Sequence, residues 1–556
     1  MDMDMDTGIS MKLDRRISAS RLAILVVACI FVPQLHAQQV SGSALPDVAS
    51  QTSTQSSLLG QNNMGSGDGR AFAITPRLSL TETWSDNVSL NTGSNGNKES
   101  GFITEVAPGV RIDARTARLK AYFDYALRGQ FYTTPSGYSQ TQNQLNTFGT
   151  LEAVSNWLYL DFSGLIAQQA ISAFGTQSPG TANINSNSTE TSTYRLSPYI
   201  RGRLAGLAEY LVRYSYSTTH ANASTASDID LSEWMGQLRG STPFQSLRWS
   251  LDASQQTSEY SQGRKTDSER IFASATYTLA PPFRLIVSGG QEANIYASVD
   301  KTTHTTHGYG FDWNPTERTQ ISAFKEKRFF GDGHRYSLSH RFPLSSISFS
   351  DTKDVSMLPN QFTTVGLGTI YDLFRQICSQ QLASQYPDPV QLDIEATKCA
   401  NQLPPSIRNT LVPSSFLTSR ATVQRRQQLA LAMQGARNTL TLMLNRNESD
   451  SILANNTLSD DFAQNGTNSI KQRGISVSLS HQLSSLSSAN LMASRQESSG
   501  AGNATLKATT TLYQGGISTK LGAKTNGSLT VRHSKFDNST NPYTENAVVG
   551  TISVIF

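Results

Sequence analysis

Apolar and polar residues alternate along most of this chain, in runs of about ten to fourteen residues. In the run that begins at Leu119, alternate positions are apolar or aromatic, and the positions between them include Lys120, Asp124 and Arg128. The same alternation recurs in runs beginning at Leu158, Leu440 and Ile475. Successive side chains of a strand point to opposite faces. The pattern therefore predicts many β-strands, each with one apolar and one polar face.

The connections between these runs alternate between short and long. Short ones are expected at 113–116, 154–156, 203–206, 280–282, 315–317, 434–435 and 522–524. Longer polar ones are expected at 86–100, 171–189, 220–229, 298–303, 450–468, 499–506 and 536–543. Transmembrane β-barrels have short periplasmic turns and longer outer loops. We predict an all-β chain that forms a transmembrane antiparallel barrel of about 22 strands, with a range of about 18–24. A soluble sandwich would show the same alternation in any single run.

The last strand of the chain is the most barrel-like. Val548, Ile552, Val554 and Phe556 share one face, and the sequence ends on the aromatic residue. This ending resembles the terminal strand of bacterial outer-membrane barrels, which closes the barrel and is read by the barrel-assembly machinery. The alternative is a buried final strand of a soluble sheet. We expect this segment to be the terminal assembly strand.

The first residues are typical of an export signal. Basic residues precede an apolar run at 22–32, and a small-residue site ends at Ala37. The run has about 11 residues, whereas a spanning helix needs roughly 20. We expect residues 1–37 to be a signal peptide, 38–69 a flexible periplasmic lead-in and 70–556 the barrel. Cys29 lies inside the apolar run and leaves with the signal.

One interval, 356–418, interrupts the strand pattern. Its apolar residues recur with helical spacing, and we expect a small α-helical insertion on the extracellular side that caps the barrel or plugs its lumen. Cys378 and Cys399 lie on the apolar faces of the two expected helices. In an oxidising compartment this pair favours a disulfide, which would stabilise the hairpin by roughly 3 kcal/mol. The alternative is two buried free thiols.

Charge and motif content exclude several functions. The formal net charge is +4 over 556 residues, with no basic block, so we expect no nucleic-acid partner. No nucleophile, phosphate-loop or zinc-protease motif occurs, and the histidines are scattered, so we expect no enzyme activity, cofactor or metal. Candidate lumen-lining residues are Lys120, Asp124, Arg128 and Arg437. Such charges either select a polar solute or pair across strands and fill a hydrated interior.

Several short phrases in the chain also resemble a known family. They are I-T-P-R (74–77), W-S-D-N-V (84–88), F-I-T-E-V-A-P-G-V (102–110), W-N-P-T-E-R-T (313–319), R-F-F-G (328–331), F-L-T (416–418), G-A-R-N-T-L (435–440) and E-N-A (545–547). Their order and spacing resemble the outer-membrane β-barrel family associated with PEP-CTERM/exosortase systems. Those systems accompany exopolysaccharide biosynthesis genes in Gram-negative bacteria. The resemblance implies an outer-membrane location and an export context, and it supplies no active site.

We therefore interpret the chain as an outer-membrane channel or export accessory for a polar polymer of exopolysaccharide type, gated by the helical insertion. The alternative is a surface anchor without a channel, which binds extracellular polysaccharide or PEP-CTERM proteins. A substrate-specific uptake receptor is a third hypothesis, weakened because 38–69 is too short and polar for a plug domain. Expected partners are outer-membrane lipid, the assembly machinery and exopolysaccharide or its export proteins.

Overall fold

The computed structural model describes residues 71–92, 98–204, 207–223, 226–244, 246–298, 300–357, 416–418, 420–452, 461–464, 466–501 and 506–556. These residues form 22 strands and one short helix. In chain order the elements are β1 (Phe72–Ser85), β2 (Gly101–Arg115), β3 (Leu119–Tyr132), β4 (Ser139–Val154), β5 (Leu158–Ala170), β6 (Ser188–Leu204), β7 (Ala208–Ala221), β8 (Ile229–Ser241), β9 (Leu247–Tyr260), β10 (Thr266–Ala280), β11 (Phe283–Asn294), β12 (Thr302–Thr316), β13 (Thr319–Arg328), β14 (Gly331–Arg341), β15 (Ser345–Ser356), β16 (Thr422–Gln434), β17 (Asn438–Ser451), α5 (Asp461–Gln464), β18 (Ser469–Gln482), β19 (Ser487–Gly500), β20 (Lys507–Lys520), β21 (Thr525–Asn538) and β22 (Tyr543–Ile555).

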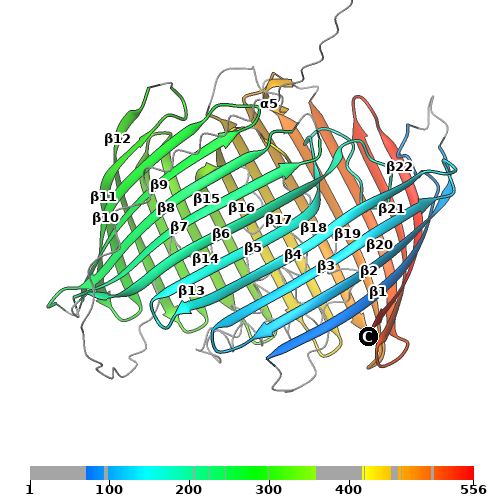
Figure 1. Cartoon of the computed structure of the whole chain (residues 1–556), viewed down its shortest axis with the longest axis horizontal. Coiled ribbons are helices and arrows are strands. Elements are labelled where there is room, and N and C mark those ends of the chain that lie inside the picture. Colours follow the sequence, from blue (N-terminus) through cyan, green and yellow to red (C-terminus); the bar gives the residue numbers. More distant parts are fainter. Residues whose placement is uncertain are drawn as a thin grey trace, which may run out of the picture. The chain divides into compact units, whose positions relative to one another are not determined.

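The strands form one closed antiparallel barrel (Figure 1). Each strand pairs with the next one in the sequence, and β22 pairs with β1 to close the ring. Closure leaves no strand edge exposed, which a sheet needs in a membrane because lipid cannot satisfy free backbone groups. The all-β barrel predicted from the alternation is confirmed, and so is its expected number of strands.

Short and long connections lie mostly at opposite ends of the barrel, the exception being the two-residue connection at 329–330 between β13 and β14. The turn after β2 at 116–118 and the turn after β4 at 155–157 are three residues long, and β1 begins and β22 ends at this same end. The long connections, such as the one between β5 and β6, lie at the other end (Figure 1). By the usual arrangement of these barrels, the short turns are periplasmic and the long connections are extracellular. The segment between β15 and β16 leaves from the extracellular end.

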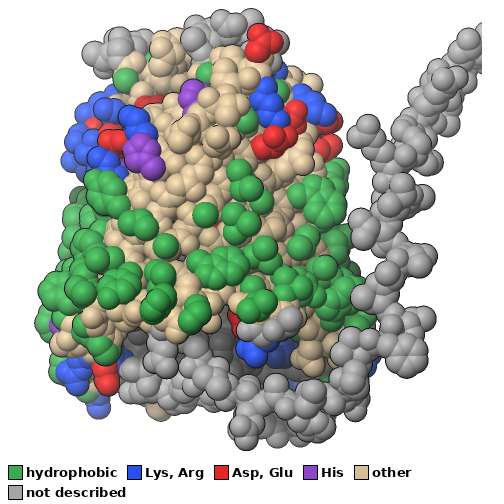
Figure 2. Space-filling model, turned by 90° about the vertical axis from the view of Figure 1, so that its left-hand side faces the viewer, with side chains coloured by type: hydrophobic (Ala, Val, Ile, Leu, Met, Phe, Trp, Pro, Cys, Tyr) green, Lys and Arg blue, Asp and Glu red, His purple; other side chains and the backbone are tan. Residues whose placement is uncertain are grey.

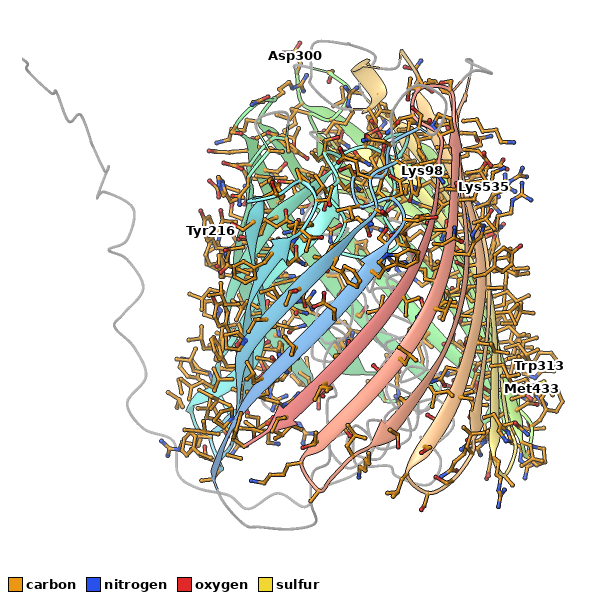
Figure 3. All side chains as sticks on the ribbon, turned by 90° about the vertical axis from the view of Figure 1, so that its right-hand side faces the viewer. Lys98, Tyr216, Asp300, Trp313, Met433 and Lys535 are labelled. Carbon is orange, nitrogen blue, oxygen red and sulfur yellow. The ribbon has the colours of Figure 1, made fainter. Side chains whose placement is uncertain are left out.

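The outer surface of the barrel is apolar over its lower part. Leu80, Ile475, Leu529 and Ile552 are each about half exposed although they are large and apolar. Figure 2 shows hydrophobic side chains in a broad belt, with charged side chains gathered above it. Trp313 and Met433 project from the lower part of the outer surface in Figure 3. A continuous apolar belt of this kind marks the surface that contacts lipid.

The strands are longer than a bilayer requires. A strand such as β1 has 14 residues. At roughly 3.3 Å per residue and a tilt of about 40°, it rises about 35 Å, whereas the apolar band of an outer-membrane barrel is about 25 Å tall. The upper ends of the strands therefore extend beyond the membrane. They form a collar there, which can carry charged residues on its outer face.

Several expectations fall outside the described residues. These are the signal peptide at 1–37, the lead-in at 38–69, nearly all of the insertion at 356–418, and the disulfide between Cys378 and Cys399. Of the insertion, only 356–357 and 416–418 are described. Ser356 is the last residue of β15. Within the described part of the chain, no helix has the length and apolar character needed to cross a bilayer.

Candidate functional site

The connection between β5 and β6, residues 171–187, lies across the outer mouth of the barrel; we call it the crossing loop. It begins on β5 and reaches the inner faces of β22 and β21, which lie five and six strands away around the ring. Asn183 in the loop donates a hydrogen bond from its Nδ2 to Oε1 of Glu545 on β22, at 2.7 Å. Arg532 on β21 donates to the same oxygen at 2.9 Å.

Glu545 is the centre of this attachment. Its side chain is fully buried, and a third donor, the hydroxyl of Ser85, contacts the same Oε1 at 2.9 Å. The partner Arg532 is also nearly buried. A buried carboxylate is tolerated only when a cation and hydrogen-bond donors surround it, and breaking such a pair costs more than breaking an exposed one. Glu545 therefore couples the crossing loop to the wall of the barrel.

The inner face of β3 and β4 holds the next part of the crossing loop. Arg128 donates from Nη1 to the hydroxyl of Thr181 at 3.0 Å. Gln142 donates from Nε2 to the Thr181 carbonyl at 3.1 Å, and the Tyr132 hydroxyl donates to the Ala182 carbonyl at 2.6 Å. These are directional polar contacts between a loop and a wall, and each contributes about 1 kcal/mol.

Two apolar clusters also hold the crossing loop in place. Phe174 packs against a buried group made of Leu90, Ala508, Phe536 and Tyr543. Ala182 and Ile184 pack against Val88, Ile103 and Tyr132. Apolar burial at an otherwise polar mouth excludes water from the loop's contacts, and this strengthens the hydrogen bonds beside them. The loop is thus a packed part of the structure.

A second segment crosses the mouth from the other side; we call residues 416–421 the return segment, because they lead from the insertion back into β16. Phe416 forms a parallel bridge with Ala170 at the end of β5, and the Leu417 amide donates to the Ala170 carbonyl at 3.2 Å. Leu417 packs against Ile229 and Tyr260. β16 and β5 are eleven places apart in a ring of 22, so the return segment spans the barrel from one wall to the opposite one.

The two segments and α5 meet in one place. The Ala173 amide in the crossing loop donates to the carboxylate of Asp461 in α5 at 2.6 Å. Ala173, Phe416, Phe462 and Ile470 form one buried apolar cluster. Movement of the return segment would therefore disturb the crossing loop, since both depend on this cluster.

The other end of the insertion is also rooted in the mouth. Met357 is buried with Leu231, Tyr296 and Ala421. Burial raises the pKa of Tyr296, which lies in the connection between β11 and β12, to about 12. The phenol stays protonated at neutral pH, so this anchor carries no charge of its own. Both ends of the insertion thus leave from buried positions at the extracellular end.

Three of the sequence phrases meet where the barrel closes. Ser85 contacts Glu545, and the Asp86 carboxylate accepts hydrogen bonds from the backbone amide and the side chain of Asn546, both at 2.7 Å. At the opposite end of the same seam, the amide of Phe556 donates to the Pro76 carbonyl at 2.9 Å. The junction of β1 and β22 is therefore the place where three phrases meet: W-S-D-N-V, E-N-A and I-T-P-R.

The expected terminal strand forms this junction. Val548 pairs with Trp84 and Ile552 with Leu80 in the β1–β22 register. Val548, Ile552 and Phe556 are exposed on the outer surface, and Val554 shares their face. The apolar face of the strand lies toward lipid.

The candidate lumen residues have different surroundings. Asp124 is almost fully buried and pairs with Arg77 of β1, and Arg128 holds the crossing loop. Lys120, on the same face of β3, is exposed near the short-turn end. Arg437 lies exposed in the turn between β16 and β17. The structure thus brings Asp124 and Arg128 to the inner wall, and it places Arg437 at the periplasmic rim, far from both.

The inner wall has two chemically distinct parts. Over much of its circumference, arginines pair with carboxylates, for example Arg213 with Asp161 at 2.9 Å and Arg328 with Glu292 at 2.7 Å. On the described inner faces of β17 to β19 there is no Lys, Arg, Asp or Glu. Amides and hydroxyls line this part of the wall: Thr441, Asn445, Asn447, Gln472, Ser478, Asn490 and Gln496.

Some polar atoms of this neutral wall lack partners. Thr441 Oγ1, Asn445 Nδ2 and Asn447 Oδ1 are buried without a hydrogen bond. Leaving a buried polar atom unpaired costs about 1–3 kcal/mol. Among the described residues, no group of three or more His, Cys, Asp or Glu could hold a metal ion.

Together, the closed ring, the apolar belt and the polar inner wall define the class of protein: an outer-membrane-type transmembrane β-barrel. No known family model matches the chain, and no curated protein matches its sequence.

Several solved structures are similar to this chain at low sequence identity. One is the siderophore receptor PirA from Pseudomonas aeruginosa, with 9% identity, a TM-score of 0.43 and coverage of 87% of this chain and 80% of that one. Another is the FrpB iron transporter from Neisseria meningitidis, with 9% identity, a TM-score of 0.46 and coverage of 87% and 81%. The ferric preacinetobactin receptor BauA from Acinetobacter baumannii has 11% identity, a TM-score of 0.43 and coverage of 87% and 80%.

Proposed function

We propose that this protein is a gated outer-membrane channel that passes a polar polymer of exopolysaccharide type. The observation that carries the proposal is a loop across the mouth: the connection that leaves β5 is attached by a hydrogen bond to a buried ion pair on β21 and β22. Polar attachments of this kind can exchange with water or with a hydroxyl-rich ligand at modest net cost. The crossing loop and the return segment act as the inner part of the gate, and the insertion acts as its outer part.

The chemistry of the neutral wall supports a carbohydrate as the cargo. A polysaccharide presents a repeating series of hydroxyl donors and acceptors, and amide and hydroxyl side chains can bind each repeat in turn without holding any one tightly. The ion-paired wall has few free charges, because arginines such as Arg213 and Arg328 are neutralised by neighbouring carboxylates. The resemblance to barrels of PEP-CTERM/exosortase systems supports the same cargo.

Planar-bilayer conductance tests the proposal. Three proteins are compared: the full-length chain, a variant with 358–415 replaced by a short Gly-Ser linker, and the same variant with 173–183 also shortened. A barrel of 22 strands is wide enough to conduct once its plug is gone. We expect low conductance in the first, intermittent opening in the second and steady, large conductance in the third. A third variant that is folded and does not conduct would overturn the proposal.

A surface anchor is the second candidate, and one observation favours it. The crossing loop is held by apolar clusters around Phe174 and Ile184 as well as by polar contacts. Apolar packing of this extent suits a mouth that stays closed. In that case the full-length protein never opens, under any voltage or with any added polysaccharide, and deletion of the gene releases cell-attached polymer without reducing its secretion.

A further inference from the structure

The charges on the outer face of the collar are segregated around the barrel. On the outward faces of β6 to β10 the Lys, Arg, Asp and Glu side chains of the described strands are all carboxylates: Glu190, Asp230, Glu259, Asp267 and Glu269. Lys265 and Lys301, in the connections beside these strands, pair with Glu259 and Glu269. The outward faces of β17 to β20 carry Arg446, Lys471, Arg473, Arg495 and Lys507, which we call the basic collar. The two sides of the barrel thus differ in the charges that their strands carry at the same end.

The basic collar faces away from the lumen. Arg446 lies two residues from the exposed Leu444, and Arg473 lies two residues from the exposed Ile475, so each shares the face of its apolar neighbour. Lys535, in the same ladder row as Arg495, projects from the upper part of the outer surface in Figure 3. These cations therefore lie directly above the lipid-contacting belt, at the level of the outer leaflet's head groups.

The collar has more cations than its carboxylates can neutralise. Glu448 contacts both Arg446 and Lys471. Glu497 likewise contacts both Arg473, at 2.6 Å, and Lys507, at 3.3 Å. Glu448 and Glu497 therefore each serve two cations. Asp450 is a third carboxylate on the same outward face, so five cations share three carboxylates. Arg495 is exposed on the same face and forms no ion pair within the described residues, which adds to the positive excess.

Two cations of the basic collar lie directly opposite each other. Arg446 and Arg473 are directly opposite each other in the β17–β18 register. On the neighbouring strands, Lys353 is directly opposite Arg425. Like charges in directly opposed positions destabilise a sheet. A phosphate between two guanidinium groups removes this repulsion, because each guanidinium can form paired hydrogen bonds to its oxygens.

We propose that the basic collar binds the phosphate groups of a phosphorylated glycolipid in the outer leaflet. Its acyl chains lie along the apolar surface beneath, over Leu444 and Ile475, and its phosphates lie between Arg446, Arg473 and Arg495. A lipid fits better than a soluble anion because cations and apolar surface adjoin on the same strands. The outward faces of β6 to β10 carry no Lys or Arg, so the barrel binds the lipid on one side.

Lipid binding to the purified full-length barrel tests this proposal. The probe is hexa-acylated lipid A with two phosphates, and its retention is measured by native mass spectrometry over a concentration series. The variant is R446Q/R473Q/R495Q. The matched control is R203Q/K265Q/K301Q, which removes three exposed cations elsewhere on the molecule. Heat-dependent gel mobility confirms that each barrel is folded.

We expect the collar variant to bind lipid A at least tenfold more weakly than the wild type. The control is expected to bind it within twofold of the wild type. The variant R446K/R473K/R495K is expected to keep most of the wild-type affinity. Lipid A with its phosphates removed is expected to bind the wild type as weakly as intact lipid A binds the collar variant. Equal retention by the collar variant and the wild type would overturn the proposal. The proposal would also be overturned if inorganic phosphate bound the wild type as well as lipid A does. It would likewise be overturned if the wild type bound sodium alginate in preference to lipid A.

Discussion

At the scale of single residues, Glu545 is the residue that joins the crossing loop to the barrel wall. Three donors from three elements meet at its Oε1, and two of them are Asn183 of the crossing loop and Arg532 of β21. A hydrogen bond to a charged group contributes about 1.5–3 kcal/mol. The charge of one side chain therefore contributes a large part of the free energy that keeps the loop in place.

The substitution Glu545→Gln is expected to open the mouth more often. Gln keeps the shape of the side chain, but it removes the negative charge and leaves Arg532 without its counter-ion. We expect the closed-to-open equilibrium to shift by about tenfold or more, which corresponds to roughly 1.4 kcal/mol or more. Opening frequency in planar bilayers measures this.

Glu448→Gln is a suitable control for that experiment, because Glu448 lies on the outer surface and pairs only with exposed cations. If both variants open as rarely as the wild type, Glu545 does not hold the gate.

A second residue-scale prediction concerns two lipid-facing glycines. A Cβ at Gly149 would collide with the ring of Phe162 and lie 2.7 Å from the Cβ of Ala121, whereas a Cβ at Gly236 would have nothing within 4 Å. Overpacking costs about 1–3 kcal/mol. Gly149→Val is therefore expected to lower the midpoint of urea unfolding in detergent, and Gly236→Val to leave it nearly unchanged. A reversed order would show that the ring of Phe162 is not packed over Gly149.

At the scale of elements, β22 has a lipid face and a lumen face that differ in their tolerance of charge. Ile552 faces lipid about 10 Å above the periplasmic end, by the rise of a tilted strand. Ile552→Lys is therefore expected to cost about 2–4 kcal/mol. Thr551→Lys, on the lumen face of the same strand, is expected to cost much less. The fraction of heat-resistant folded barrel in membranes measures both, and equal losses would contradict the assigned faces.

The sequence predicts these elements well because each strand's pattern is local. The alternation from Leu119 onward distinguishes the two faces of β3 without any knowledge of its neighbours, and turn residues mark the short connections. The turns at 242–246 and 342–344 were not among the predicted ones. They contain Phe244 and Leu344, which are exposed and apolar and resemble strand residues when read alone.

The crossing loop could not be predicted from sequence. Asn183 and Glu545 are 362 residues apart, and nothing in the residues around Asn183 indicates that this connection folds inward. The sequence indicated only a long polar connection at 171–189. The E-N-A phrase that contains Glu545 contributed only to the family resemblance, and its contact with the loop emerges only in three dimensions. The Cys378–Cys399 disulfide stays a prediction.

At the scale of the whole molecule, the barrel combines three surfaces with separate roles. The apolar belt fixes its depth in the membrane, the basic collar is its proposed lipid-binding side, and the polar inner wall lies below the crossing loop. The neutral part of that wall and the basic collar lie on opposite faces of the same strands, β17 to β19. Period-two alternation allows one set of strands to carry both.

Current blockade by a polysaccharide tests the central claim most directly. The variant with 358–415 replaced and 173–183 shortened is placed in a planar bilayer, and linear polysaccharide chains of defined length are added on the periplasmic side. The account predicts brief blockades whose duration increases with chain length, and polymer recovered on the other side. An open, conducting variant that neither shows blockades nor passes polymer would contradict it.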